Sequence, residues 1–497
     1  MIKRIIKNII ALFAGNGVQL LTQLLLPPAF IAAYGIQGYG QWLVLFAAVG
    51  YVASLDLGLQ TYLLNEVTIL YHKGNVEEFH RVQSIGTRLI LGIIATGMLL
   101  GSILFLIPLR SLLNVPFEQT ELAAILYFFA LQLLWSIGLV YLSCLFRIIG
   151  KAYRGTMWLN VQRLVVLITT IGLTLLQASF LLIAITQAFL VVIGIIAVIF
   201  DIRINAPEIF PRLTFWDSSR AMSMVKPSFF FGVFTLNNFL IFQLPLLVMN
   251  WYLGASVVAV FSIARVLFSF VRQGMTGMQM SISPEITRLD ATQDHAKLRR
   301  LYDITESLTL SFSLILNFGM LIIAPVALQV WLRKPEIYNL TTFSLLCAIT
   351  GLMSVKEAKL YFHYWTNNHI GVSIITITAS LILVGVSIPA IKHFGIDGFL
   401  LAWLIAEFIQ TVIIHKCNIR LIRNGPLLSP RPLIIFCIIL ACMGTFLYML
   451  LNFGKIIGTI PLILLAIGVA ICITFFSYKY FNLLGVIGEL KSRWSIS

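Results

Sequence analysis

Two arginines in the second half of the sequence are spaced for anion binding. Arg265 and Arg272 lie in one apolar segment at 257–282, seven residues apart. Seven residues are close to two turns of an α-helix, so the two guanidinium groups would share one helix face, about 10 Å apart. A guanidinium is a planar fork of donors that binds phosphate through paired hydrogen bonds. Together the two groups could hold a diphosphate, unless they snorkel to lipid headgroups.

Other polar side chains in apolar segments could line the same site. Arg163 lies near the start of the segment at 157–176, where it either snorkels to the membrane surface or lines a cavity. Asn237 and Asn238, in the segment at 227–250, could bind sugar hydroxyls. Hydrogen bonding between neighbouring helices is the more ordinary use of such amides.

Two carboxylates lie deep in apolar segments. Asp56 is in the segment at 41–65, and Glu407 is in the segment at 398–415. A carboxylate in such surroundings can carry a proton or bind a sodium ion during a transport cycle. The structural alternative is an ion pair or a hydrogen bond to the backbone.

Lys356 and Lys359 lie toward the inner end of the segment at 340–362, with Glu357 between them. Charged groups at the end of an apolar segment usually belong to the membrane surface. We expect these three residues at the inner interface.

The composition requires that these segments cross a membrane. Of 497 residues, 59% are hydrophobic and 11% are charged, whereas soluble proteins carry about 25% charged residues. Runs of about 20 apolar residues fill the chain and exclude a sizeable soluble catalytic domain. The six cysteines form no C-x-x-C pair, so they indicate neither a disulfide framework nor a metal site. The sequence predicts an all-α polytopic membrane protein.

Fourteen apolar runs are long enough to be transmembrane helices. They lie at about 8–32, 41–65, 85–107, 120–143, 157–176, 180–200, 227–250, 257–282, 306–331, 340–362, 371–391, 398–415, 433–452 and 457–478. With the N-terminus in the cytoplasm, most of the 34 Lys and Arg residues fall on the inner side. Those in the outer loops are Arg110, Arg333, Lys334, Lys392 and Lys455. This asymmetry follows the positive-inside rule and predicts that both termini are cytoplasmic. The two longest inner loops could form amphipathic helices at the interface.

An internal repeat relates the two halves of the chain. A shift of 219 positions aligns the turn at Gly35 with the turn at Gly254, each followed by small residues and an aromatic residue. The same shift brings Pro27 and Pro28 close to Pro245. Proline removes a backbone donor and kinks a helix, so matching prolines predict mobile helices that face a common cavity. The alternative is that proline is simply common in membrane helices.

The repeat predicts two six-helix lobes related by an axis along the membrane normal. The N-lobe comprises 1–205 and the C-lobe comprises 206–425, while 426–497 contains two further helices and a cytoplasmic tail.

Two sequence motifs accompany this topology. The first is Y-G-x-x-x-Y-G-x-W at 34–42, and the second is Asp56-Leu57-Gly58-Leu59. With the Ser262–Arg265 stretch they resemble the Wzx-type oligosaccharide flippases, a polysaccharide transporter family that carries O-antigen and capsule repeats. That family belongs to the MOP superfamily with the MATE drug exporters and the MurJ lipid II flippase.

The resemblance implies alternating access in the bacterial inner membrane. Two lobes would rock around a cationic cavity and flip an undecaprenyl-pyrophosphate-linked oligosaccharide for synthesis of a surface polysaccharide, such as the O-antigen of lipopolysaccharide. We expect no cofactor and no nucleic acid, and we expect a monomer in the lipid bilayer. Proton or sodium coupling stays open, and so do contacts with a polysaccharide polymerase and a chain-length regulator.

Three other functions compete with this one. A MATE-like cation or drug antiporter shares the topology but typically has twelve spans and a more acidic cavity. A lipid II flippase is a second alternative. A membrane-embedded glycosyltransferase or polymerase would need acidic residues in an outer loop or a large outer loop, and the loop at 33–41 contains no carboxylate.

Overall fold

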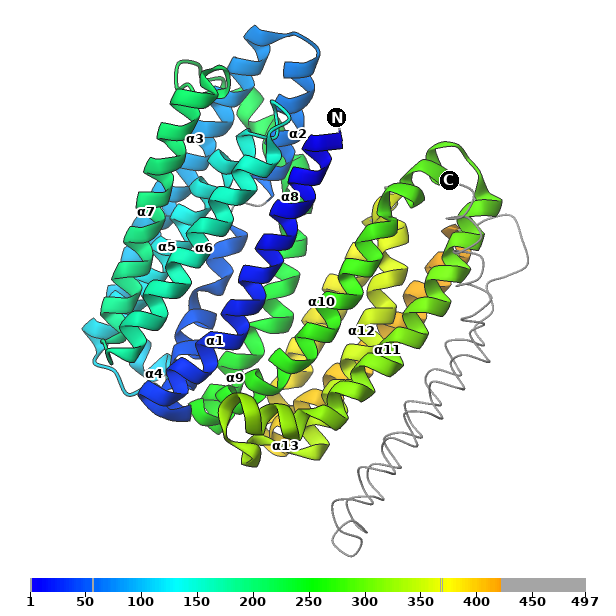
Figure 1. Ribbon diagram of the computed structural model, residues 1–497. Coiled ribbons are helices and arrows are strands. Elements are labelled where there is room, and N and C mark those ends of the chain that lie inside the picture. The colour runs from blue at the N-terminus through cyan, green and yellow to red at the C-terminus, as the bar shows by residue number, and fades with distance from the viewer. Residues whose placement is uncertain (1, 56–57, 367, 369, 422–497) are drawn as a thin grey trace, which may run out of the picture. The chain divides into compact units, whose positions relative to one another are not determined.

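The computed structural model describes residues 2–55, 58–366, 368 and 370–421, and all regular elements in these ranges are helices (Figure 1). Asp56, the segment 426–497 and the last two predicted spans lie outside the described residues. The α-helices are α1 (Ile2–Val49), α2 (Leu59–His72), α3 (Val76–Gly101), α4 (Leu109–Leu113), α5 (Gln119–Leu145), α6 (Ala152–Leu175), α7 (Phe180–Asn205), α8 (Ser218–Phe242), α9 (Leu244–Leu253), α10 (Ala255–Ala291), α11 (His295–Leu332), α12 (Leu340–Trp365) and α13 (Ile370–Leu421). Short 3-10 helices are η1 (Gly50–Ser54), η2 (Ser102–Phe105), η3 (Pro207–Ile209) and η4 (Pro335–Ile337).

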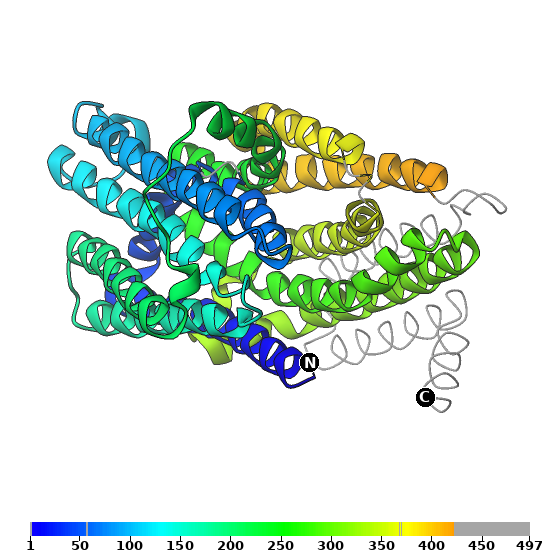
Figure 2. The ribbon, with the colours of Figure 1, turned by 90° about the horizontal axis from the view of Figure 1, so that it is seen from above.

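The chain forms two compact units, one up to Val260 and one from Phe261 onward. In unit 1, α5 packs against α3, α6 and α7, and α6 packs against α1 (Figures 1 and 2). In unit 2, α12 packs against α11 and α13. The lobe boundary predicted at 205/206 rests on the sequence repeat and stays a prediction.

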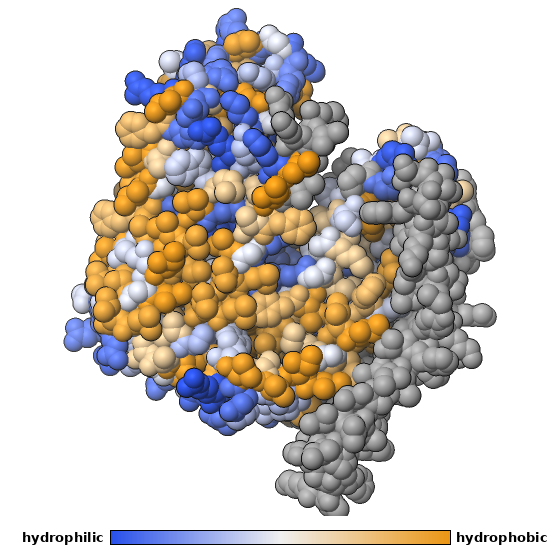
Figure 3. Space-filling model, in the orientation of Figure 1, coloured by the Kyte–Doolittle hydropathy of each residue, from blue (hydrophilic) through white to orange (hydrophobic). Residues whose placement is uncertain are grey.

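The surface of the helices is that of a multi-pass membrane protein. Within the described ranges, 8 helices are long and apolar enough to cross a membrane. On α7 the side chains of Phe189, Ile193, Phe200 and Ile204 are all more than half exposed and recur about once per turn. Figure 3 shows hydrophobic side chains over the middle of the helices of unit 1 and hydrophilic ones toward their ends. A soluble monomer does not expose so large an apolar surface.

Helix α1 contains the first predicted span and the second one up to Val49; the rest of the second span includes η1 and the start of α2. The 48 residues of α1 would measure about 72 Å as one straight helix, twice the thickness of the hydrocarbon core. The backbone leaves the helical conformation at Gly35, with φ 73° and ψ 178°. The ring centroids of Phe30 and Trp42 lie 4.7 Å apart, so the chain turns back at this glycine.

The equivalent turn of the second half has the same backbone conformation. Gly254 connects α9 to α10 with φ 87° and ψ 166°, close to the values at Gly35, the residue that the 219-residue shift aligns with it. This region of φ and ψ is essentially accessible to glycine alone. The two turns that the predicted repeat aligns thus share one backbone conformation, while the repeat of whole lobes stays a prediction.

Helix α13 contains the eleventh and twelfth predicted spans. Its backbone is non-helical at Gly395, where φ is 63° and ψ is −146°. A Cβ atom on Gly398 would lie 2.5 Å from the carbonyl oxygen of Ala390, although eight residues of straight helix measure about 12 Å. The chain therefore reverses here too. Among the predicted spans up to residue 415, the second is divided among α1, η1 and α2, the third between α3 and η2, and the seventh between α8 and α9; each of the others corresponds to a part of one helix.

The prolines have different local effects. The seventh span is interrupted at Gln243, two residues before Pro245, and is divided into α8 and α9. By contrast, α1 continues as a helix through Pro27 and Pro28. Whether these positions gate transport stays a prediction.

The inner connections differ from the expected amphipathic helices. In the first, α2 ends at His72 and α3 begins after Asn75, whose side chain accepts a hydrogen bond from the Glu78 N–H at 3.2 Å. In the central connection, residues 210–217 have no regular helix. Gln83 on α3 donates to the Ile209 carbonyl at 2.8 Å, and Ser84 bonds both polar backbone groups of Phe215 at 2.8 and 2.9 Å. These contacts with α3 replace the helical hydrogen bonds of the segment.

Helices α10 and α11 extend beyond the predicted spans at the ends where they meet, because their polar ends are good helical sequence. Only three residues separate them, between Ala291 and His295. Asp294 caps α11 by accepting from the Lys297 N–H at 3.1 Å. The Lys297 ammonium also lies 2.7 Å from this carboxylate and lowers the pKa of Asp294.

We predict that Gly35→Ala and Gly254→Ala each destabilise the protein by about 1–3 kcal/mol, because alanine must adopt a strained backbone. Added methyl groups meet no atom within 4 Å at either position, so the loss would come from the backbone alone. Thermal unfolding of the purified protein in detergent measures it. The control is Gly172→Ala within α6, where a methyl group also meets nothing within 4 Å and alanine favours the helix. An equal loss in all three variants would contradict the prediction.

Candidate functional site

The most polar part of unit 2 surrounds α12. Lys356 and Lys359 are only 4% and 2% exposed, so both side chains are enclosed by the bundle; their depth relative to the inner interface stays a prediction. Helix α12 continues to Trp365, which places Lys356 about 14 Å before the helix end. The charges of this helix are therefore within the bundle.

Helical geometry sends these charges to different neighbours. Successive residues are 100° apart around a helix, so Glu357 points away from the side shared by Lys356 and Lys359. In the structure Lys356 contacts α13, Glu357 contacts α10, and Lys359 contacts α11 and α13. Each neighbouring helix contributes at least one polar partner.

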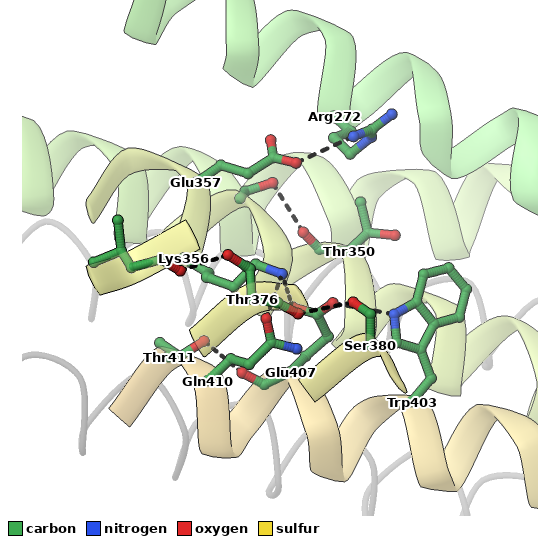
Figure 4. Close-up of polar contacts among 12 residues, drawn as sticks. Arg272, Thr350, Lys356, Glu357, Thr376, Ser380, Trp403, Glu407, Gln410 and Thr411 are labelled. Carbon is green, nitrogen blue, oxygen red and sulfur yellow. Dashed lines mark hydrogen bonds and ion pairs between the residues drawn. The ribbon is translucent and has the colours of Figure 1, made fainter. Parts of the chain in front are cut away.

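The deepest contact is between Lys356 and Glu407 (Figure 4). The Lys356 Nζ atom lies 2.6 Å from Glu407 Oε2, and the two side chains are 5% and 0% exposed. The Trp403 indole donates to Glu407 Oε1 at 3.1 Å, and Lys356 donates to Gln410 Oε1 at 3.5 Å. Two roles for Glu407 are compatible with the sequence, ion coupling and an ion pair. The structure shows the ion pair. Ion coupling at Glu407 stays a prediction and would require the pair to open.

A second buried cluster surrounds Lys359. Its ammonium forms an ion pair with Glu306 and lies 2.9 Å from the hydroxyl of Tyr302 and 3.2 Å from His415 Nδ1. Asn418 donates to the same tyrosine oxygen at 3.3 Å. A lysine ammonium has three donors, and these three acceptors use them. His415 Nε2 is buried without a hydrogen-bond partner among the described residues.

A small cavity adjoins this cluster between α11 and α12. Its lining residues are Tyr302, Thr305, Glu306, Thr309, Val355, Ala358, Lys359 and Phe362.

The third contact joins α12 to α10. Arg272 Nη1 lies 3.1 Å from Glu357 Oε1 (Figure 4), and Thr276 donates to the other carboxylate oxygen at 3.5 Å. The side chains of Arg272 and Glu357 are 33% and 19% exposed. Arg265, two turns earlier on α10, is half-buried and lies over the ring of Phe261, 5.5 Å from its centroid.

The remaining predicted site residues belong to unit 1. Arg163 on α6 and Asn238 on α8 are exposed. The amide oxygen of Asn237 is buried without a hydrogen-bond partner in the described part of the chain. The structure thus brings Arg272 and Glu407 into one network through neighbouring residues of α12, and it does not place Arg163 or the two asparagines in that network.

Most of the polar residues that contact α12 were not predicted from the sequence, although their spacing along α11 and α13 indicates them. In α13 the polar residues follow a helical period, so they share one face; they are Trp403, Glu407, Gln410, Thr411, His415 and Asn418. In α11 a similar series is Tyr302, Thr305, Glu306, Thr309, Ser313 and Asn317. Two such stripes in apolar segments indicate helices that face a polar neighbour.

We predict that Glu407→Gln and Lys356→Met each destabilise the protein by about 3–5 kcal/mol, because each leaves a buried charge without its partner. The double variant should lose much less than the sum, since it removes both charges. Thermal unfolding in detergent gives the coupling energy of this double-mutant cycle. Additive losses would show that the two groups do not interact.

The fold has known relatives among solved structures. An inward-facing multidrug resistance MATE family transporter of the MOP superfamily matches with a TM-score of 0.67 and 13% identity, over 81% of this chain and 94% of that one. The lipid II flippase MurJ, in an inward closed conformation, matches with a TM-score of 0.63 and 13% identity, over 97% of this chain and 100% of that one. A MOP superfamily transporter from Pyrococcus furiosus, described by the reverse polarity of its binding pocket, matches with a TM-score of 0.56 and 14% identity, over 84% and 95%.

No protein-family model and no curated protein sequence matches the chain. At these low identities the structural matches establish the fold. The chain has the fold of MOP superfamily transporters, as the sequence predicted.

Proposed function

We propose that the protein flips an undecaprenyl-pyrophosphate-linked oligosaccharide across the bacterial inner membrane for synthesis of a surface polysaccharide. It would act as a transporter by alternating access, with both termini in the cytoplasm. The MOP fold supports transport of this kind, because it is shared with a lipid II flippase and with MATE transporters.

The observation that carries this proposal is the pair of arginines on α10. Arg265 and Arg272 are both half-buried on one apolar helix. An arginine at the centre of a membrane helix costs about 2.5–3.5 kcal/mol on the insertion scale, so its presence there favours a role in binding. A pyrophosphate is the anionic group of the proposed substrate, and the guanidinium fork suits it.

Two further observations favour a lipid-linked substrate over a cationic drug. Cationic side chains such as Arg265 and Arg272 on α10 are poor ligands for a cation. The match to MurJ also includes nearly the whole of both chains, whereas the first MATE match leaves about a fifth of this chain uncovered.

We predict that deleting the gene removes a surface polysaccharide and accumulates its lipid-linked repeat on the cytoplasmic leaflet. Gel analysis of the polysaccharide and extraction of labelled lipid intermediates measure both effects. An intact polysaccharide together with new sensitivity to cationic dyes would instead identify a cation antiporter. Accumulation of lipid II with loss of cell shape would identify a lipid II flippase.

We also predict that Arg265→Ala and Arg272→Ala reduce export to the level of the deletion strain while the protein remains in the membrane. Lysine at either position keeps the charge but loses the planar fork, so it should restore export only in part. Matched controls are Arg110→Ala and Lys334→Ala, which remove a positive charge from the outer connections and should leave export unchanged. Normal export in both arginine-to-alanine variants would remove the phosphate-binding role.

A further inference from the structure

The three ion pairs that α12 forms within the described part of unit 2 differ in their access to solvent. Lys356 with Glu407 is 5% and 0% exposed, and Lys359 with Glu306 is 2% and 10% exposed. Arg272 with Glu357 is 33% and 19% exposed. An incoming ligand could therefore reach the third pair without opening the helix packing, and could not reach the other two.

The contact at Arg272 is also weakly held. The Nη1 nitrogen of Arg272 lies 3.1 Å from Glu357 Oε1, and the hydrogen bond from Thr276 to the other oxygen is long, at 3.5 Å. With one long hydrogen bond and both side chains partly exposed, this pair is held less firmly than the two enclosed pairs. A phosphate group offers more charge and more acceptor oxygens, and it can bind a guanidinium through two parallel hydrogen bonds.

We propose that Glu357 is an internal competitor for the anion site at Arg272. The Glu357 carboxylate pairs with the Arg272 guanidinium when no substrate is bound. When substrate binds, one of its phosphate groups displaces the carboxylate from the guanidinium. The substrate class rests on the proposed function, but the competition itself requires only a phosphate-bearing ligand.

This exchange keeps the arginine charge compensated at every stage. A guanidinium without an anion is costly inside a membrane, so an empty anion site there needs an internal substitute. When the phosphate leaves, Glu357 can return to Arg272 and prevent the ligand from rebinding. The carboxylate thus weakens substrate binding and favours release, which a transporter needs as much as it needs capture.

The test uses the full-length protein in detergent, with inorganic pyrophosphate as the ligand in isothermal titration calorimetry. We expect Glu357→Gln to bind pyrophosphate about three- to tenfold more tightly than the wild type, since the internal anion is gone. Arg272→Ala should abolish this binding, and Glu357→Gln should produce no gain when Arg272 is absent. A purely structural role for Glu357 predicts unchanged or weaker binding.

Two further variants keep the result interpretable. Thr276→Val removes the hydrogen bond that positions Glu357 and changes no charge, so it should tighten binding by a smaller factor even if Glu357→Gln folds poorly. Glu285→Gln makes the same glutamate-to-glutamine change on α10, 13 residues after Arg272, where Glu285 pairs with Arg288 at 2.5 Å. It should leave the affinity unchanged. Equal tightening in Glu285→Gln would show a general charge effect and overturn the proposal.

The competition and the proposed function can fail separately. Unchanged or weaker binding in both Glu357→Gln and Thr276→Val overturns the competition, even if the deletion strain loses its polysaccharide. Tighter, Arg272-dependent binding supports it, even if the deletion strain keeps its polysaccharide and another phosphate-bearing substrate must be sought. Pyrophosphate binding that persists in Arg272→Ala also overturns the proposal, because the anion would then bind elsewhere.

Discussion

An ionised side chain inside a membrane must have a partner within the protein, and unit 2 is built around this constraint. Helix α12 carries Lys356, Glu357 and Lys359 within four consecutive positions, in the second half of a 26-residue helix. Since these residues point to different sides, counter-charges must come from different helices. Glu407 on α13, Arg272 on α10 and Glu306 on α11 provide them. The polar interior therefore fixes the mutual positions of four helices that apolar packing alone would leave free to slide.

Unit 1 uses its polar contacts differently, mostly at the helix ends. Arg154 on α6 donates two hydrogen bonds to Asp201 on α7, at 2.7 and 2.5 Å, and Trp158 donates to the same carboxylate at 2.7 Å. Gln83 and Ser84 hold the central connection against α3. Backbone groups outside regular helices need such partners, and here Gln83 and Ser84 provide them near the start of α3.

The fold could be predicted from the sequence to a greater extent than the site. The apolar runs located the long described helices, and the alignment of Gly35 with Gly254 anticipated two turns of the same unusual conformation. The interior of unit 2 was not anticipated, because depth was judged from the end of the apolar run. That run stops at residue 362, but α12 continues to Trp365 and its neighbours extend further still. Which residues of α11 and α13 face Lys359 depends on helix rotation, which a single sequence leaves undetermined.

The three ion pairs differ in burial and are therefore suited to different roles. A buried charge can change partners only by passing through a state in which it has neither a partner nor water. Such a state costs several kcal/mol. Lys356 and Lys359 are therefore suited to holding α11, α12 and α13 together while the protein changes conformation. A half-exposed pair can exchange partners with solvent assistance, so Arg272 and Glu357 are suited to change during transport. Because Glu357 and Lys356 are adjacent on one rigid helix, an anion that binds at Arg272 acts on the contact between α10 and a helix that is otherwise locked to its neighbours.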